Sequence, residues 1–256
     1  MTRRLRPWSA TQVGVFCALA GLTVLIVGYN YPRGWWLKEF VFEVYPNSGA
    51  DLIGASIVIL LIERFSRLRD DEERRRQLVR ECASSDHAVA GRALLELDAR
   101  GWLAEGALAG ARLIGADLSG AQLAGMDLSA ADLVGSTLEG ADLSRASLIG
   151  ARLTGANLKR AVLEWAVAND AKLSGADLRG ADAGGAKLMR VDLSHADLRD
   201  ADLSGADLSG ADLAYADLRG CHLATAVLES ASLNSARSDQ TTKWPTVMSR
   251  TERDDE

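Results

Sequence analysis

The side chains of this chain that could carry out chemistry are few and widely spaced. Catalysis or metal binding would need histidine, cysteine or carboxylate groups at set spacings, such as a nucleophile beside a base. The histidines and cysteines stand far apart, at His87, His195, His222, Cys17, Cys82 and Cys221. The sequence also contains no phosphate-binding glycine loop, nucleophile elbow or pair of catalytic carboxylates. It therefore predicts a protein that is not an enzyme, with no catalytic residues, metal site or cofactor.

The aspartates, by contrast, recur at intervals of five residues. They precede leucines in units that read Ala-Asp-Leu-Ser-Gly, as at residues 116–120 and 206–210. From Leu103 to Leu233, every fifth residue is Leu at 25 of 27 positions, with Ala168 and Ala183 as the exceptions. No insertion interrupts the period, which also differs from the nine-residue, glycine-rich period of calcium-binding repeats.

A period of five fits neither regular element. On a helix, steps of five carry the leucines around the axis, and on a long strand they send successive leucines to opposite faces. Within one unit, however, Ala and Leu lie two residues apart, so a short extended piece points both the same way. Gly or Ser then allows a corner before the next piece. The pattern predicts a solenoid with an interior of Leu and Ala.

These units resemble the pentapeptide-repeat family, whose units read Ala-Asp/Asn-Leu-x-x. The resemblance implies a β-solenoid over residues 103–238, a right-handed quadrilateral β-helix with four units to each coil. At about 4.8 Å per coil, nearly seven coils would make a rod roughly 30 Å long. Residues 239–256 are expected to form a C-terminal cap and a disordered tail, because Trp244-Pro245 resembles the turn that ends many members of the family.

With four units to a coil, residues twenty apart would stack and form columns. One column places three acids beside three arginines: Asp177, Asp197 and Asp217 beside Arg179, Arg199 and Arg219. One interpretation is a polar docking face for a protein partner. The other is a structural lattice of solvated ion pairs, which are common and contribute little. These six residues are candidate partner-binding residues.

A second irregularity interrupts the regular pattern near the middle of the repeats. Trp165 occupies an outward corner position, and Val162 and Val167 stand where Asp is usual. Exposed tryptophan and aliphatic side chains can mark a binding site. Single exposed apolar residues are also normal on soluble proteins. Trp165, Val162 and Val167 complete the set of candidate partner-binding residues.

Two apolar runs precede the repeats. After a basic N-terminus (1–12), residues 13–29 are apolar apart from Thr23, near the short limit for a spanning helix. The second run, 52–62, reaches spanning length only when it is extended back to about residue 46. Arginines are concentrated after it, so the positive-inside rule favours a transmembrane hairpin at 13–62, with spans at about 13–29 and 46–62. A cleaved signal peptide is the rival interpretation of the first run.

Charged and helical segments join these runs to the repeats. Residues 63–83 carry acid-to-base pairs four residues apart, such as Asp70 with Arg74, which favour a solvated helical stalk. A weak self-association through a short coiled coil is the alternative for this stalk. Ser84, Ser85 and Asp86 can begin a second helix, so residues 84–102 are expected to form an N-terminal cap on the solenoid. This order of segments resembles two-span membrane proteins that carry pentapeptide repeats.

The predicted function is a membrane-anchored interaction scaffold for an unidentified protein partner. The predicted location is the cytoplasmic (inner) membrane of a bacterium, with the repeats facing the cytoplasm. The alternation of acids with the arginines after residue 62 argues against nucleic-acid binding. The alternative comes from the family resemblance: some members mimic DNA and modulate a type II topoisomerase (gyrase). That mode needs a continuous acidic face, and here arginines neutralise the strongest aspartate column.

Overall fold

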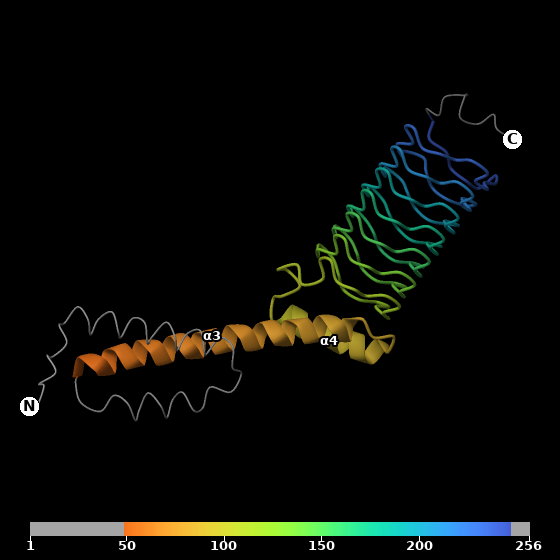
Figure 1. The fold of residues 1–256 in the computed structure, drawn as a ribbon. Coiled ribbons are helices and arrows are strands. Elements are labelled where there is room, and N and C mark those ends of the chain that lie inside the picture. The colour runs from red at the N-terminus through yellow and green to blue at the C-terminus, as the bar shows by residue number, and fades with distance from the viewer. Residues whose placement is uncertain (1–48, 247–256) are drawn as a thin grey trace, which may run out of the picture. The chain divides into compact units, whose positions relative to one another are not determined.

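The computed structural model describes residues 49–246, in which two helices precede a solenoid (Figure 1). The chain divides into two compact units, residues 1–74 and 75–256. Helix α3 (Gly49–Cys82) contributes to both units, and helix α4 (His87–Ala99) and the solenoid belong to the second. The expected basic N-terminus and first membrane span, and the far end of the tail, lie outside the described residues.

Helix α3 does not support the predicted second span. It begins at Gly49, includes Asp51, and reaches the charged residue Glu63 after only fourteen residues, whereas a spanning helix needs about 20. It then continues without a break through the charged segment to Cys82. Within residues 49–246, no helix combines the length and the apolar character required to cross a membrane.

Helix α4 covers the first coil of the solenoid. Asp86 is its N-cap: the side-chain Oδ1 accepts hydrogen bonds from the backbone N–H groups of Ala88 (2.8 Å) and Val89 (3.3 Å). The helix ends before Gly101, which has a φ of 73°. Its apolar side, with Ala90, Ala93, Leu94 and Leu97, is buried in the same core cluster as the first repeat leucines. The apolar end of the solenoid is thereby shielded from water.

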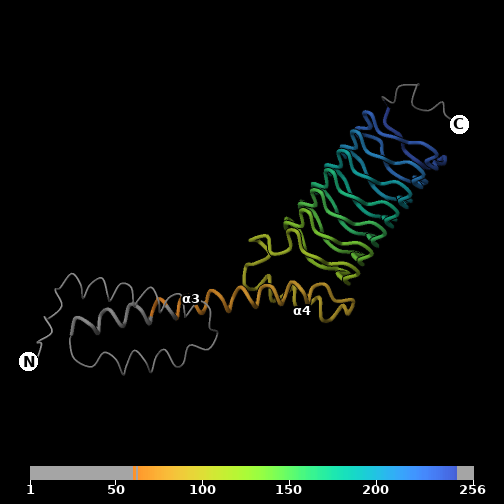
Figure 2. Tube along the Cα trace, viewed as in Figure 1, coloured from red at the N-terminus to blue at the C-terminus, as the bar shows by residue number. Residues whose placement is uncertain are grey.

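The repeats form a β-solenoid whose coils stack along one axis (Figure 2). Corners every five residues and bridges every twenty give it four sides, as the sequence predicts. Parallel bridges join each residue to the residue twenty positions later, from Arg112–Asp132 to Asp217–Arg237. The N–H of Leu113, for example, donates to the carbonyl of Asp132 (2.7 Å). We number the faces 1 to 4 by the leucine that begins each column, namely Leu113, Leu118, Leu123 and Leu128. Corner 1 follows the leucines of face 1, and so on around the coil.

Each corner is a tight turn with a left-handed residue at its outer end. In the first corner, the N–H of Ala116 donates to the carbonyl of Leu113 (3.2 Å), and Gly115 has a φ of 66°. Glycine adopts this conformation without the steric cost that a Cβ adds. Among the described residues, eleven residues other than glycine also have a positive φ, and all stand at this corner position of the repeats. Trp165, His195 and Tyr215 are the aromatic or imidazole members of this group.

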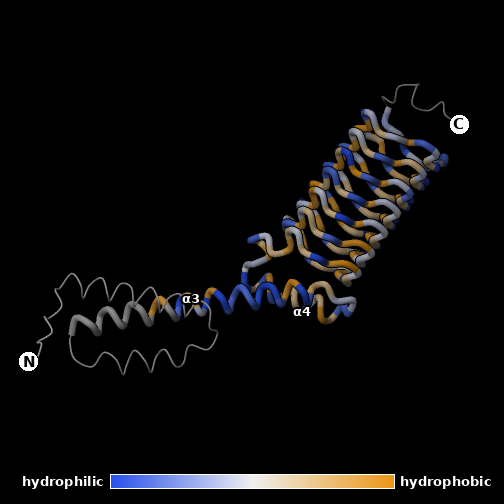
Figure 3. The backbone as a smooth tube through the Cα atoms, viewed as in Figure 1, coloured by the Kyte–Doolittle hydropathy of each residue, from blue (hydrophilic) through white to orange (hydrophobic). Residues whose placement is uncertain are grey.

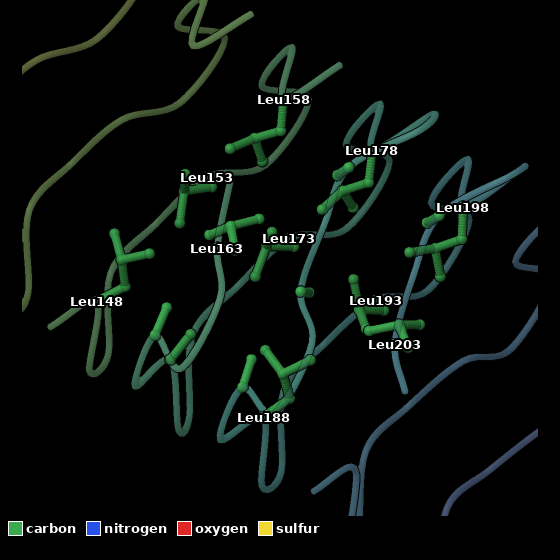
Figure 4. Close-up of a pocket in the computed structure, with 16 residues that line it drawn as sticks. Leu148, Leu153, Leu158, Leu163, Leu173, Leu178, Leu188, Leu193, Leu198 and Leu203 are labelled. Carbon is green, nitrogen blue, oxygen red and sulfur yellow. The ribbon is translucent and has the colours of Figure 1, made fainter. Parts of the chain in front are cut away.

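The core consists mainly of the buried leucines and alanines of the repeats. Hydrophobic and hydrophilic residues alternate along the coils (Figure 3). Ala183 interrupts the leucine column of face 3 and Ala168 that of face 4, and a cavity of about 20 Å³ lies among the leucines and alanines around them (Figure 4). Every residue that lines the cavity is Leu or Ala. An apolar cavity of this kind stays dry, because a water molecule would find no hydrogen-bond partner there.

One extra residue enters the ladder at its C-terminal end. Lys243 pairs with His222, which is 21 rather than 20 residues earlier. The hydroxyl of Thr242 donates to the carbonyl of Leu218 (2.9 Å), and Trp244 packs against the core cluster. The insertion lets the chain turn across the last coil while the backbone ladder continues.

Candidate protein-docking surfaces

The arginine–aspartate ladder lies where face 2 meets corner 2. In each of its three C-terminal coils, the arginine forms a bidentate pair of hydrogen bonds with the aspartate two residues before it. In the first, Arg179 Nε donates to Asp177 Oδ1 (2.9 Å) and Nη2 donates to Oδ2 (2.8 Å). Arg199 with Asp197, and Arg219 with Asp217, repeat this geometry at 2.6–2.8 Å. The predicted column therefore exists as a set of charge-assisted hydrogen bonds.

Contacts between coils join these pairs into one continuous ladder. Lys159 Nζ lies 3.1 Å from Asp177 Oδ2, and Arg179 Nε lies 3.4 Å from Asp197 Oδ2. Arg199 Nε reaches Asp217 Oδ2 at 3.8 Å. Cations and anions thus alternate along four coils, and each aspartate faces two cations. The ladder presents balanced charge rather than an acidic stripe.

The hydrogen bonds keep the ladder's carboxylates ionised. Partial burial raises the pKa of Asp177, but hydrogen bonds from Arg179 and Lys159 outweigh it and bring the pKa to about 2. The arginine hydrogen bonds likewise lower the pKa values of Asp197 and Asp217. The ladder is therefore fully charged at neutral pH.

Trp165 stands at corner 3, one corner further around the rod. Its backbone is left-handed, with a φ of 58°, and the residue is 62% exposed. The indole ring lies on Gly185, in the next coil: a Cβ at residue 185 would meet Trp165 Cζ3 at 2.7 Å. One side of the ring is thus held against bare backbone. Much of the remaining ring surface faces solvent.

Val162 and Val167 flank this corner, on faces 3 and 4, and both are half-buried. The structure therefore brings Val162, Trp165 and Val167 together around one corner. The ladder occupies a different corner, but corners 2 and 3 are the two borders of face 3. Segment 179–185 crosses that face, from Arg179 at one border to Gly185, beneath the indole, at the other.

The incomplete core lies behind the same corner. Ala168 follows Trp165 into face 4, and Ala183 precedes Gly185 on face 3. The cavity between them is small, and at the usual loss of stability per unit of cavity volume it lowers the free energy of unfolding by only about 0.5 kcal/mol. The two departures from Leu, the exposed Trp165 and the Gly184-Gly185 pair therefore belong to one irregular region of two adjacent coils.

Sequence reasoning missed a pair of stacked rings at corner 1. His195 and Tyr215 have ring centroids 4.9 Å apart and ring planes inclined by only 4°. Their spacing of twenty residues, at the corner position of consecutive coils, was the signal that could have revealed the stack.

The described residues contain no group of three or more histidine, cysteine or acidic side chains that could hold a metal ion. Cys82 and Cys221 are buried, and burial raises the pKa of both thiols to about 12. Neither thiol is therefore ionised at neutral pH, as a nucleophilic cysteine would have to be.

Comparison with known proteins identifies the repeats. The family model "Pentapeptide repeats" matches residues 108–145, 146–182, 186–224 and 206–237. A pentapeptide repeat protein from the Arabidopsis thaliana thylakoid lumen is 31% identical, with a TM-score of 0.40, over 41% of this chain and 72% of that one. HetL, a pentapeptide repeat protein involved in heterocyst differentiation regulation from the cyanobacterium Nostoc sp. strain PCC 7120, is 35% identical, with a TM-score of 0.30, over 52% of this chain and 76% of that one.

QnrB1, a plasmid-mediated fluoroquinolone resistance protein, is 21% identical, with a TM-score of 0.30, over 52% of this chain and 84% of that one. No curated protein matches the chain. The repeat model, together with the two relatives above 30% identity, agrees with the five-residue units and the four-sided coils. The chain belongs to the pentapeptide-repeat family, whose members form right-handed β-helices.

Proposed function

We propose that this protein is a non-enzymatic scaffold that binds a protein partner on face 3 of its rod. The observation that carries the proposal is Trp165, an exposed aromatic residue held in a left-handed conformation at the border of that face. A residue with a Cβ adopts this conformation at a cost of about 1–2 kcal/mol, and glycine would avoid that cost. Ten other non-glycine residues share this corner conformation, so the exposed indole ring, and not the backbone alone, carries the proposal.

The setting of Trp165 suits it to be the centre of an interface. Tryptophan is among the residues that contribute most to protein–protein binding. Because the ring rests on Gly185, it has little freedom to lose when a partner binds, and pre-organisation of this kind favours affinity. Val162 and Val167 add apolar surface on either side of the ring.

The ladder supplies the opposite, polar border of the same face. Arg179, Arg199 and Arg219 use Nε and Nη2 to hold their aspartates, so Nη1 of each guanidinium is available to donate to a partner. Their side chains are 37–45% exposed. In this proposal a partner lying flat on face 3 contacts Trp165 at one border and accepts hydrogen bonds from the arginines at the other.

Site-specific photocrosslinking in the full-length protein tests this surface. A photoreactive amino acid replaces Trp165 in one variant and Arg199 in another, and replaces Ser230 in a control. Ser230 has the same left-handed conformation but stands at corner 4. We expect one adduct of the same mass from the first two positions and none from Ser230. Equal labelling from all three positions, or none from the first two, would reject face 3 as the docking surface.

The charge balance of the ladder disfavours the alternative of a gyrase modulator that mimics DNA. Such mimicry needs a continuous acidic face, and each aspartate of the strongest column here is paired with an arginine. A supercoiling assay with purified gyrase checks this point. We expect no change in supercoiling at micromolar excess of the protein.

Attachment to the cytoplasmic membrane, with the rod facing the cytoplasm, is a separate part of the proposal and rests on the sequence. The apolar run at 13–29 and the arginines that follow residue 62 support it. Extraction of cell membranes with alkaline carbonate provides the test. An anchored protein stays with the membrane pellet, and release of the full-length protein into the supernatant would contradict the anchor.

A further inference from the structure

Corner 1 carries a second surface that the rod itself does not require. Four of its consecutive coils have glycine at the left-handed position: Gly115, Gly135, Gly155 and Gly175. The next two coils instead have His195 and Tyr215, with φ values of 59° and 60°. Both side chains therefore adopt a conformation that glycine would adopt more easily. The rings stack on one another with centroids 4.9 Å apart, and Tyr215 is 59% exposed.

The stack leaves one face of the tyrosine ring open. His195 covers the side of the ring that faces the preceding coil. The next residue in the column is Ser235, which is exposed and too small to cover an aromatic ring. A planar group of a partner can therefore extend the stack by one layer, at the spacing that His195 and Tyr215 already show.

Two aspartates on face 1, Asp192 and Asp212, stand three residues before the two stacked rings. Asp212 is exposed on face 1, three residues before Tyr215, and is bridged to Asp192 in the coil before. Each uses Oδ1 to accept a hydrogen bond from the backbone two residues later, at 3.0 Å for Ala214 and 3.1 Å for Ser194. Neither forms an ion pair with any described residue, in contrast to the aspartates of the ladder on face 2. The negative charge of Asp212 attracts a cation that lies over the open face of Tyr215.

We propose that Tyr215, His195 and Asp212 form a docking site for an arginine side chain on a partner protein. A guanidinium group is planar, stacks on aromatic faces and donates hydrogen bonds in a fork that matches a carboxylate. It can lie on the open face of Tyr215 and donate to the free oxygen of Asp212. An ammonium group lacks the plane, and an uncharged planar group lacks the attraction to the aspartates. This site stands at the corner diagonally opposite Trp165 and does not depend on docking at face 3.

Binding of short labelled peptides to the full-length protein tests the site. The probe is a fluorescein-labelled glycine peptide with two arginines, and its matched controls carry lysine or citrulline at the same positions. Fluorescence anisotropy gives the dissociation constant. We expect saturable binding of the arginine peptide, binding of the lysine peptide that is weaker by roughly fivefold, and no binding of the citrulline peptide.

Variants locate the binding at corner 1. Tyr215→Gly removes the ring while placing at the corner the residue that four other coils have there, so the coil can form as before. We expect Tyr215→Gly and Asp212→Asn each to raise the dissociation constant by roughly fivefold or more. Tyr215→Phe keeps the ring, and Ser230→Gly changes a left-handed residue at another corner. The dissociation constants of both variants for the arginine peptide should stay within about twofold of the parent value.

Several results would overturn the proposal. They are no binding of the arginine peptide, equal binding of the lysine or citrulline peptide, and an unchanged dissociation constant in Tyr215→Gly or in Asp212→Asn. None of these variants changes face 3, so the crosslinking yield from position 165 should be the same in all of them. Failure at corner 1 is thereby distinguished from failure of the proposed scaffold function.

Discussion

The indole of Trp165 lies on Gly185 so closely that a Cβ at residue 185 would sit 2.7 Å from Cζ3 of the ring. The two residues are twenty apart in the sequence and occupy the same corner of consecutive coils. Gly185 thus has two reasons to be glycine: its φ of 65°, which it shares with the other corner glycines, and the ring above it. The contact fixes the orientation of the most exposed aromatic side chain on the rod.

Replacement of Gly185 by alanine separates these two reasons. Gly175→Ala is the matched control, because Gly175 has a φ of 66° and a Cβ there would meet nothing within 4 Å. We expect Gly175→Ala to lower the free energy of unfolding by about 1–2 kcal/mol through backbone strain alone. Gly185→Ala should cost about 0.5–1.5 kcal/mol more, because the exposed ring must also leave its present rotamer. Chemical denaturation measures both, and equal costs would show that the ring does not rest on Gly185.

The core cavity predicts an unusual response to added bulk. Ala168→Leu or Ala183→Leu restores the regular leucine column and should stabilise the protein by about 1 kcal/mol, since each leucine buries new apolar surface. Ala168 and Ala183 line the same cavity, so the double variant should gain less stability than the sum of the two single variants. Ala141→Leu is the control at a fully buried alanine of the regular pattern and should cost about 1–3 kcal/mol. If all three substitutions destabilised the protein, Ala168 and Ala183 would not line space that a leucine can fill.

The ladder predicts a loss of stability in acid. The pKa of Asp177 is about 2 in the folded protein and near 3.9 in an unfolded chain, so folding favours the ionised form. The resulting stabilisation is fully present above about pH 4 and is lost as the pH falls toward 2. After allowance for solvent screening we expect it to be about 1 kcal/mol. Chemical denaturation of the parent and of Asp177→Asn at pH 7 and pH 2.5 measures this effect. The free energy of unfolding should fall more in the parent than in the variant between the two pH values. Equal falls would mean that other groups cause the loss of stability in acid.

The N-cap of α4 should matter for the first coil as well as for the helix. Asp86→Ala removes the acceptor of the N–H groups of Ala88 and Val89 and should cost about 1 kcal/mol. Because α4 covers the first coil, amide hydrogen exchange should rise there and remain unchanged near Leu218, at the far end of the rod. Asp98→Ala, at an exposed position of the same helix, is the control. An equal increase in amide exchange along the whole rod in Asp86→Ala would indicate that α4 does not specifically protect the first coil.

Much of the fold could be predicted from the sequence because the repeat is local and strict. A leucine every five residues, with Ala two positions earlier, defines what points inward, and four units to a coil then define the columns. The contacts of Arg179, Arg199 and Arg219 with their aspartates follow from this spacing. These interactions join residues two positions apart in one extended segment, where the backbone leaves the side chains little choice.

Other features depended on choices that the repeat does not determine. The direction in which Trp165 turns depends on the residue in the next coil, and the bare backbone of Gly185 lets the ring lie there. The stack of His195 on Tyr215 likewise required both rings to adopt the same orientation. The extra residue before Lys243 became clear only from its pairing with His222. The second span, predicted at about 46–62, is not supported by α3, which reaches the charged Glu63 fourteen residues after Gly49; no helix within residues 49–246 is long and apolar enough to cross a membrane.

Crosslinking from Arg199, with and without Trp165, tests the docking surface most directly. The photoreactive residue replaces Arg199 in the full-length protein, and the partner adduct is quantified in the parent, in Trp165→Gly and in Ser230→Gly. Trp165→Gly suits the left-handed corner, so the rod should keep its thermal stability, which circular dichroism verifies. We predict that the adduct falls by roughly tenfold in Trp165→Gly and is unchanged in Ser230→Gly. An adduct of equal yield in all three proteins would contradict docking on face 3.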